Sequence, residues 1–215
     1  MLEFVFEDGF GFERYADYML DVPMYFAFRN GDYMDVSGES FREFMKGKLP
    51  QLPGEEAHMG DWSDHITTAF PEVRMKRFLE MRGADGGPWA SICALSAFWT
   101  GLLYDDAAQK AALALISDWT SEDRLTLRDQ APITGLKAKV AGRSLQDVAK
   151  DALAIARDGL NARACLDTSG NNEAHFLGHL DSVAESGITP AEAKLALFNG
   201  AWGGDVRKIY GEFAY

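Results

Sequence analysis

The sequence predicts an α+β fold in which part of an antiparallel sheet comes first and a layer of helices follows. Two short β-prone runs flank Asn30-Gly31, a dipeptide that favours a two-residue hairpin turn because both positions accept positive φ. Farther along, apolar residues recur every three or four positions from Leu145 to Leu160, which is the pattern of an amphipathic helix. We therefore expect a single domain over residues 1–215, with strands and a glycine-rich loop in 1–103 and helices in 104–215.

The first hundred residues contain the predicted hairpin, at residues 24–36, and two short helices. We expect the first helix at residues 40–46 and the second to run from a cap at Asp61 to about Thr68. Proline and glycine residues mark the loop between them. No internal repeat, low-complexity tract or clear interdomain linker divides the sequence.

The segment from Val73 to Arg82 predicts a strand, because apolar residues are interleaved with charged ones. A glycine-rich loop follows, and a helix should run from Pro88, which suits the first helical position, to about Leu103. Two later helices should begin at threonines that have an acidic residue three positions on, Thr120 and Thr189.

Composition limits the partners that the chain can have. Its 215 residues carry a formal net charge of −12, which repels nucleic acids and anionic membranes. No apolar run reaches the roughly 18 residues of a membrane span, and the acidic start is unlike a signal peptide. Cys93 and Cys165 are too few for a disulfide framework, which favours reduced thiols and a cytoplasmic location. The sequence assigns neither cysteine a role.

The strand predicted at residues 73–82 has two unlike faces. One is mostly apolar, and the other carries three cations, a carboxylate and an aromatic ring: Arg74, Lys76, Phe78, Glu80 and Arg82. A charged face on an antiparallel sheet is usually just solvated. However, this face ends at a glycine-rich loop, and glycines let a backbone approach a ligand closely. Trp89 follows the loop, either as the wall of a small pocket or as an anchor in the core.

Glu80 and Arg82 together suit phosphoryl chemistry. A carboxylate oxygen is a ligand that Mg²⁺ prefers, and the arginine fork matches phosphate oxygens. By itself this pair is a weak motif, because Glu-x-Arg occurs often by chance. His175 and His179 have a spacing that can bind zinc, but no further ligand is evident, so a structural interpretation is favoured there.

Several segments resemble the plant and proteobacterial type of glutamate–cysteine ligase. The run from Phe78 to Trp89 is the specific one. The supporting segments follow in order along nearly the whole chain: Asp21–Phe26, His65–Thr68, Phe70–Arg74, Gly101–Asp105, Asp118–Thr120, Ala184–Gly187, Thr189–Glu192 and Gly211–Tyr215. The chain resembles only the carboxy-terminal half of these longer enzymes, and more distantly the glutamine synthetase-like ligases.

The resemblance implies an ATP-dependent ligase that joins the γ-carboxylate of glutamate to the amine of cysteine through a γ-glutamyl phosphate, in the first step of glutathione biosynthesis. ATP, glutamate and cysteine would be the substrates and Mg²⁺ the cofactor. The sheet would be glutamine synthetase-like. The chain would be a partial enzyme, the carboxy-terminal part of a larger catalytic domain, completed by an amino-terminal half or by self-association. The alternatives are a truncated, non-catalytic homologue that binds a ligand or partner, and a structural remnant.

The same resemblance implies roles for five residues. Glu80 would bind Mg²⁺, and Arg82 would be catalytic by stabilising the transferring phosphoryl group. Arg74 would contact the phosphates of ATP. Tyr25 and Trp89 would line the amino-acid pocket.

Overall fold

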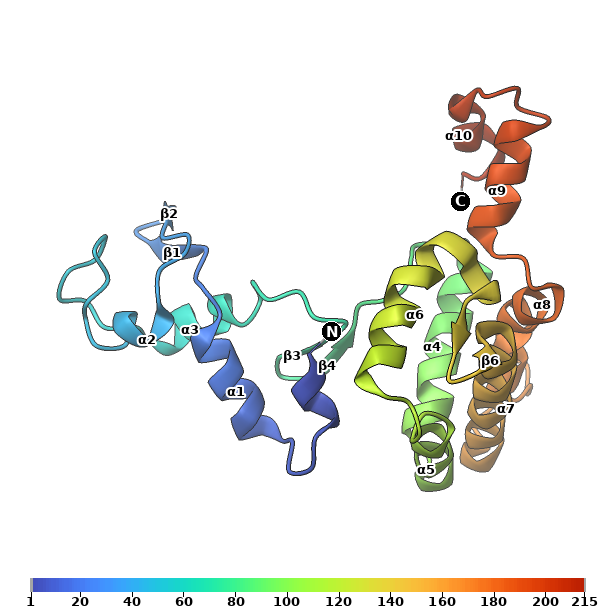
Figure 1. Cartoon of the computed structure of the whole chain (residues 1–215), viewed down its shortest axis with the longest axis horizontal. Coiled ribbons are helices and arrows are strands. Elements are labelled where there is room, and N and C mark those ends of the chain that lie inside the picture. Colours follow the sequence, from blue (N-terminus) through green and yellow to red (C-terminus); the bar gives the residue numbers. More distant parts are fainter. Residues whose placement is uncertain (1, 215) are drawn as a thin grey trace. The chain divides into compact units, whose positions relative to one another are not determined.

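The computed structural model describes residues 2–214, and it combines helices with small antiparallel sheets, as the α+β prediction requires (Figure 1). The chain forms two compact units, residues 1–84 and 85–215. The division falls in the glycine-rich loop. Each unit is described below by itself. Whether both belong to one larger catalytic domain stays a prediction.

The described residues of the first unit, 2–84, form three short α-helices and two β-hairpins. Its elements are η1 (Glu3–Phe6), α1 (Phe12–Asp21), β1 (Phe26–Arg29), β2 (Asp32–Asp35), α2 (Phe41–Phe44), α3 (Met59–His65), β3 (Val73–Met75) and β4 (Leu79–Met81).

The first hairpin confirms the turn predicted at Asn30-Gly31. Both residues have positive φ, 54° and 91°, and strands β1 and β2 pair in an antiparallel register. The inner face of the hairpin buries Ala27, and Val36 just beyond β2 is buried with it. They pack with Phe41, Phe44 and neighbouring apolar residues into one core cluster. The turn thus sets the register that puts the small apolar residues on the buried face.

Helix α3 corrects the predicted cap. The N-cap residue is His58 rather than Asp61, and the Asp61 carboxylate accepts a hydrogen bond from the His58 backbone N–H in a capping box. Asp61 is buried, and Arg29 donates to its two oxygens at 2.6 and 3.0 Å. The helix also ends at His65, short of the predicted Thr68. Asp61 thus serves two partners at once, the start of the helix and Arg29 on β1.

The segment 73–82 is not the continuous strand that the sequence predicts. It folds back at Arg77 into the hairpin β3–β4, in which Arg74 lies opposite Glu80. Hydrogen bonds from Lys76 N–H to the Phe78 carbonyl and from Arg82 N–H to the Glu72 carbonyl extend the ladder at both ends. An oppositely charged cross-strand pair stabilises such a hairpin. Because even-numbered residues pair with even-numbered ones, the predicted grouping on one face survives the change.

The second unit is mostly helical. Its elements are α4 (Trp89–Leu103), α5 (Asp106–Leu115), α6 (Ser121–Thr134), η2 (Gly135–Lys137), β5 (Lys139–Val140), β6 (Arg143–Ser144), α7 (Leu145–Arg163), η3 (Glu173–Leu177), α8 (Gly178–Ser186), α9 (Pro190–Asn199), η4 (Val206–Lys208) and α10 (Ile209–Glu212).

The ends of these helices mostly agree with the sequence. Thr120 and Thr189 begin α6 and α9 with complete capping boxes, which confirms both predictions. Pro88 is the N-cap of α4 rather than its first helical residue. Cys93 and Cys165 form no disulfide with each other. No helix formed by the described residues 2–214 is long and apolar enough to cross a membrane.

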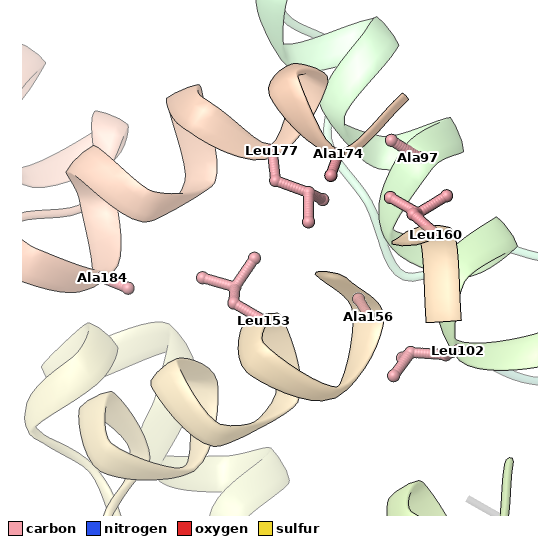
Figure 2. Packing of buried hydrophobic residues seen from close by; sticks show 8 residues of the cluster. All are labelled: Ala97, Leu102, Leu153, Ala156, Leu160, Ala174, Leu177 and Ala184. Carbon is pink, nitrogen blue, oxygen red and sulfur yellow. The ribbon is translucent and has the colours of Figure 1, made fainter. Parts of the chain in front are cut away.

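The core of the second unit lies between α4, α7 and the η3–α8 segment. Figure 2 shows its side chains, with Leu153 on α7 and Leu177 on η3 pointing toward the same space. Helices α4 and α7 approach each other very closely at two glycines. A Cβ atom on Gly101 would lie 2.1 Å from the Ala156 carbonyl oxygen, and one on Gly159 would lie 2.0 Å from the Gly101 carbonyl oxygen. Only glycine fits at this crossing.

We predict that Gly101→Ala or Gly159→Ala destabilises the chain, because the added methyl group meets rigid backbone. The expected loss in the free energy of unfolding is about 2 kcal/mol or more, the upper part of the range for overpacking. Urea unfolding followed by the helical circular dichroism signal measures it. Gly178→Ala on α8 is the matched control, because its Cβ atom would meet nothing within 4 Å. Equal stability of the control and the two crossing variants would contradict the close approach.

We also predict that Asp61→Asn lowers the free energy of unfolding of the first unit. The variant should also make that free energy less sensitive to acid. Burial alone would raise the pKa of Asp61, but the hydrogen bonds from Arg29 and His58 outweigh it, so the pKa lies below its ordinary value. The charged form therefore stabilises the fold above the unfolded pKa of about 3.9, and this stabilisation is lost as the pH falls through the folded value.

The expected cost of Asp61→Asn at pH 7 is about 2 kcal/mol, the scale of a hydrogen bond to a charged group. The variant should also lose less stability than the wild type between pH 7 and pH 3. Chemical unfolding at both pH values measures the two effects. Asp64→Asn, on the same helix, is the control. A variant with the wild-type pH response would show that Asp61 is not the titrating group.

Candidate functional site

The β3–β4 hairpin brings together four of the charged residues that the sequence places on one face. Glu80 lies at the centre, with Arg74, Lys76 and Arg82 around it. The Glu80 carboxylate is 2.8 Å from Arg74 Nη2, 3.2 Å from Arg82 Nη1 and 3.9 Å from Lys76 Nζ. Three cations around one carboxylate leave a local excess of positive charge. Such a cluster favours an anion with several oxygens, of which phosphate is the common biological example.

The opposite face of the hairpin is apolar. Val73, Met75 and Leu79 line a cavity of about 490 Å³ together with aromatic residues near the start of the chain, among them Phe6, Phe10 and Tyr15. The hairpin therefore separates a hydrophobic side from a charged side. Any polar chemistry of this hairpin belongs to the charged side.

Arg74 differs from the other two cations in being buried, at 6% exposure. Its Nη1 donates to the backbone carbonyls of Thr67 and Ala69, at 2.5 and 3.2 Å. Its Nε donates to Glu80 Oε2 at 2.9 Å. The guanidinium thus ties the chain that follows α3 to the β4 strand. The ATP contact predicted for Arg74 stays a prediction, but most of its donors are already engaged.

Glu80 is ionised by its surroundings. Partial desolvation would raise the pKa of its carboxyl, but the hydrogen bond from Arg74 and the charges of Arg74, Lys76 and Arg82 outweigh that effect and lower it. Glu80 is thus an anion at neutral pH. Its Oε2 is held tightly by Arg74, whereas Oε1 has only the looser contact with Arg82.

Phe70 also belongs to this cluster. The sequence analysis includes it only in the family-like segment Phe70–Arg74 and predicts no role for it. Its ring is 67% exposed, and the guanidinium carbons of Arg82 and Arg74 lie 5.5 and 6.0 Å from its centre. At these distances a cation is attracted by the ring face. Arg82 therefore contacts the Phe70 ring in addition to Glu80. No periodicity marks it, because it precedes the hairpin in a loop.

Tyr25 and Trp89, the predicted walls of the amino-acid pocket, lie in different units. Tyr25 lies just before β1 and is 52% exposed. Trp89 is the first residue of α4, and it borders a cavity of about 260 Å³ with Cys93, Thr100 and Glu173. It is 75% exposed, so among the described residues of the second unit it is not the core anchor that was the alternative interpretation.

Two glycines of the loop before α4 have no structural explanation within the described chain. Gly83 and Gly86 do not adopt positive φ, and a Cβ atom on either would meet nothing within 4 Å. Other residues would fit at both positions as far as residues 2–214 are concerned. Room beside this backbone is what a closely approaching ligand requires.

The described residues contain no group of three or more histidine, cysteine, aspartate or glutamate side chains placed to hold a metal ion. Glu80 supplies a single carboxylate. Mg²⁺ ordinarily takes one or two carboxylates and completes its octahedron with phosphate oxygens and water. The site therefore fits Mg²⁺ only if a bound phosphate and water supply the other ligands. His175, one of the two histidines considered for zinc, lies near the Asn172 carbonyl and Asp167 instead.

Comparison with known proteins gives a consistent family. The family model described as "Glutamate-cysteine ligase family 2 (GCS2)" matches residues 1–212. Chloroplastic glutamate–cysteine ligases of Arabidopsis thaliana and Brassica juncea are 54% and 52% identical to this chain over all 215 residues. The chain spans 40% and 41% of the length of these two relatives.

The names of these relatives place them in chloroplasts, so the cytoplasmic location expected for this chain stays a prediction. The family match confirms the resemblance on which the site assignments depend, and it extends over both compact units. This chain belongs to glutamate-cysteine ligase family 2.

Proposed function

We propose that this chain forms part of a ligase that joins the γ-carboxylate of glutamate to the amine of cysteine, with ATP as the energy source. The observation that carries the proposal is the charged side of the β3–β4 hairpin, where Glu80 lies among three cations. The names of the relatives supply the two amino acids. The product would be the dipeptide that enters glutathione biosynthesis.

The chemistry explains why cations are needed. A carboxylate is a poor electrophile, so its oxygen first attacks the γ-phosphorus of ATP, and ADP leaves. The cysteine amine then attacks the acyl carbon of the γ-glutamyl phosphate, loses a proton, and inorganic phosphate leaves. Negative charge on oxygen moves at both steps, and catalysis depends on positioning and on fixed positive groups.

Arg82 is the residue we assign to the transferring phosphoryl group. It is only partly buried, and a single contact of 3.2 Å to Glu80 engages one of its donors. The Phe70 ring at 5.5 Å limits where its guanidinium can lie. Arg82 can thus present a fork to phosphate oxygens without first giving up a tight ion pair.

Glu80 would hold Mg²⁺ through Oε1, the oxygen that Arg74 does not bind. Bound there, Mg²⁺ would neutralise charge on the phosphate oxygens of ATP. Tyr25 and Trp89 would each keep the amino-acid-binding role that the family resemblance implies for it, and Gly83 and Gly86 would leave room for the ligands beside the backbone.

We further propose that groups outside these 215 residues complete the site. The described residues offer one carboxylate for the metal, and their three two-stranded sheets are small. Each hairpin has edges that could pair with further strands in a glutamine synthetase-like antiparallel sheet. Those strands would come from the part of the ligase that this chain does not match, or from a second copy. A non-catalytic ligand-binding homologue is the alternative that the next experiments distinguish.

The isolated chain should therefore make γ-glutamylcysteine far more slowly than a complete ligase. Purified chain is incubated with ATP, Mg²⁺, glutamate and cysteine, and phosphate release is followed together with the dipeptide. The matched sample is a hybrid enzyme, the Arabidopsis thaliana relative with its matching region replaced by residues 1–215. Activity of the hybrid with little activity of the chain is the expected result. An inactive hybrid that folds would favour the non-catalytic alternative, and full turnover by the chain would contradict a partial enzyme.

In the hybrid enzyme, Glu80→Gln and Arg82→Lys should each lower turnover about a hundredfold, the usual cost of losing one transition-state donor. Glutamine keeps the size of Glu80 but is a poorer Mg²⁺ ligand, so high Mg²⁺ should partly restore its activity. Lysine keeps the charge of Arg82 but not its fork. Thr126→Ala, exposed on α6, is the control. Wild-type turnover by Glu80→Gln at ordinary Mg²⁺ would show that Glu80 is not a metal ligand and that this face of the hairpin is only solvated.

A further inference from the structure

The cation that is hardest to reach on the charged side of the hairpin is also the one with the most hydrogen bonds. Arg74 is buried, whereas the side chains of Lys76 and Arg82 keep 26% and 28% of their surface exposed. A residue that binds ATP phosphates directly would need its donors accessible. Because Arg74 is buried, direct binding of ATP does not explain why an arginine occupies this position.

The donors of Arg74 can be counted. A guanidinium has five N–H groups in a fixed fork. Nη1 donates to the Thr67 and Ala69 carbonyls, and Nε donates to Glu80 Oε2. Nη2 lies 2.8 Å from that same oxygen. One N–H on Nη2 is left over, and the paired Nε and Nη2 edge, which phosphate would need for bidentate binding, already faces Glu80.

These contacts fix both groups that surround Arg82. Arg74 holds Glu80 Oε2, which leaves Oε1 facing Arg82 Nη1. Arg74 also binds the carbonyl of Ala69, the residue directly before Phe70, whose ring lies 5.5 Å from the Arg82 guanidinium. The same buried cation thus determines where the carboxylate and the aromatic ring lie.

We infer that Arg74 is a positioning residue, which acts on the reaction through Glu80 and the Phe70 loop rather than by contact with ATP. The inference rests on the proposed function, since it names how that site is held in place. Groups that orient a ligand-binding residue typically change affinity or activity by about 10- to 100-fold when they are altered. A direct phosphate contact would instead be expressed mainly in the KM for ATP.

A double-mutant cycle in the hybrid enzyme separates the two roles. Arg74→Lys should lower kcat by about 10- to 100-fold and change the KM for ATP by less than about threefold. In a Glu80→Gln background, Arg74→Lys should cost less than about threefold more, because residues that act through one another are not additive. Arg77→Lys, at the exposed hairpin tip, is the matched control and should leave both constants unchanged. Arg74→Lys that raises the KM for ATP equally in both backgrounds, with kcat unchanged, would overturn the inference.

A second measurement needs no activity, so that failure of the inference and failure of the proposed function can be told apart. In nitrogen-15 spectra of the 215-residue chain, the Nε–H of Arg74 should exchange with water at least about tenfold more slowly than that of exposed Arg77, because it is buried and hydrogen-bonded. Glu80→Gln should abolish most of this protection. Equal exchange at Arg74 and Arg77 would overturn the inference even in an active hybrid. Protection at Arg74 in an inactive hybrid would reject the proposed function alone and leave the arrangement of the cluster standing.

Discussion

The ion pair between Arg74 and Glu80 is the contact on which the charged side of the β3–β4 hairpin depends. It joins the two strands at the middle of their short ladder, and it places a carboxylate among three cations. Because the guanidinium also binds two carbonyls of the preceding loop, the pair fixes Phe70 as well. A pair this well hydrogen-bonded can be kept partly out of water without leaving a charge unpaired.

Much of the fold follows from local signals in the sequence. Asn30-Gly31 predicted its hairpin because the turn is made by two adjacent residues, and the threonine caps of α6 and α9 were predicted because a capping box spans four residues. The β3–β4 turn was missed because Lys76-Arg77-Phe78 contains none of the residues that usually mark a turn. The cap of α3 was misplaced because the side chain of His58, not of Asp61, accepts from the first N–H groups of the helix. The ion pair of Asp61 was missed because its partner Arg29 lies far away in the sequence.

The sequence also predicted part of the candidate site, namely which charged residues share one face of the hairpin. Alternation put Arg74, Glu80 and Arg82 on one face, and the hairpin keeps them there because its register pairs even-numbered residues. The burial of Arg74 could not be predicted, because it depends on carbonyls whose positions follow from the path of the chain after α3. Phe70 was missed as a cation support for the same reason. Residue types indicate which groups suit phosphate, but only the packed loop shows which of them remain accessible.

The positive cluster of the hairpin contrasts with the acidic charge of the whole chain. The chain carries a net charge of −12, yet three cations lie around one carboxylate on a single short hairpin. An anion approaching the rest of such a surface is repelled, and the field of the clustered cations is what attracts it. Arg74 contributes its charge to this field even though most of its donors are occupied, since electrostatic attraction requires no direct contact. Burial therefore removes Arg74 from direct recognition while it still helps to make this hairpin attractive to an anion.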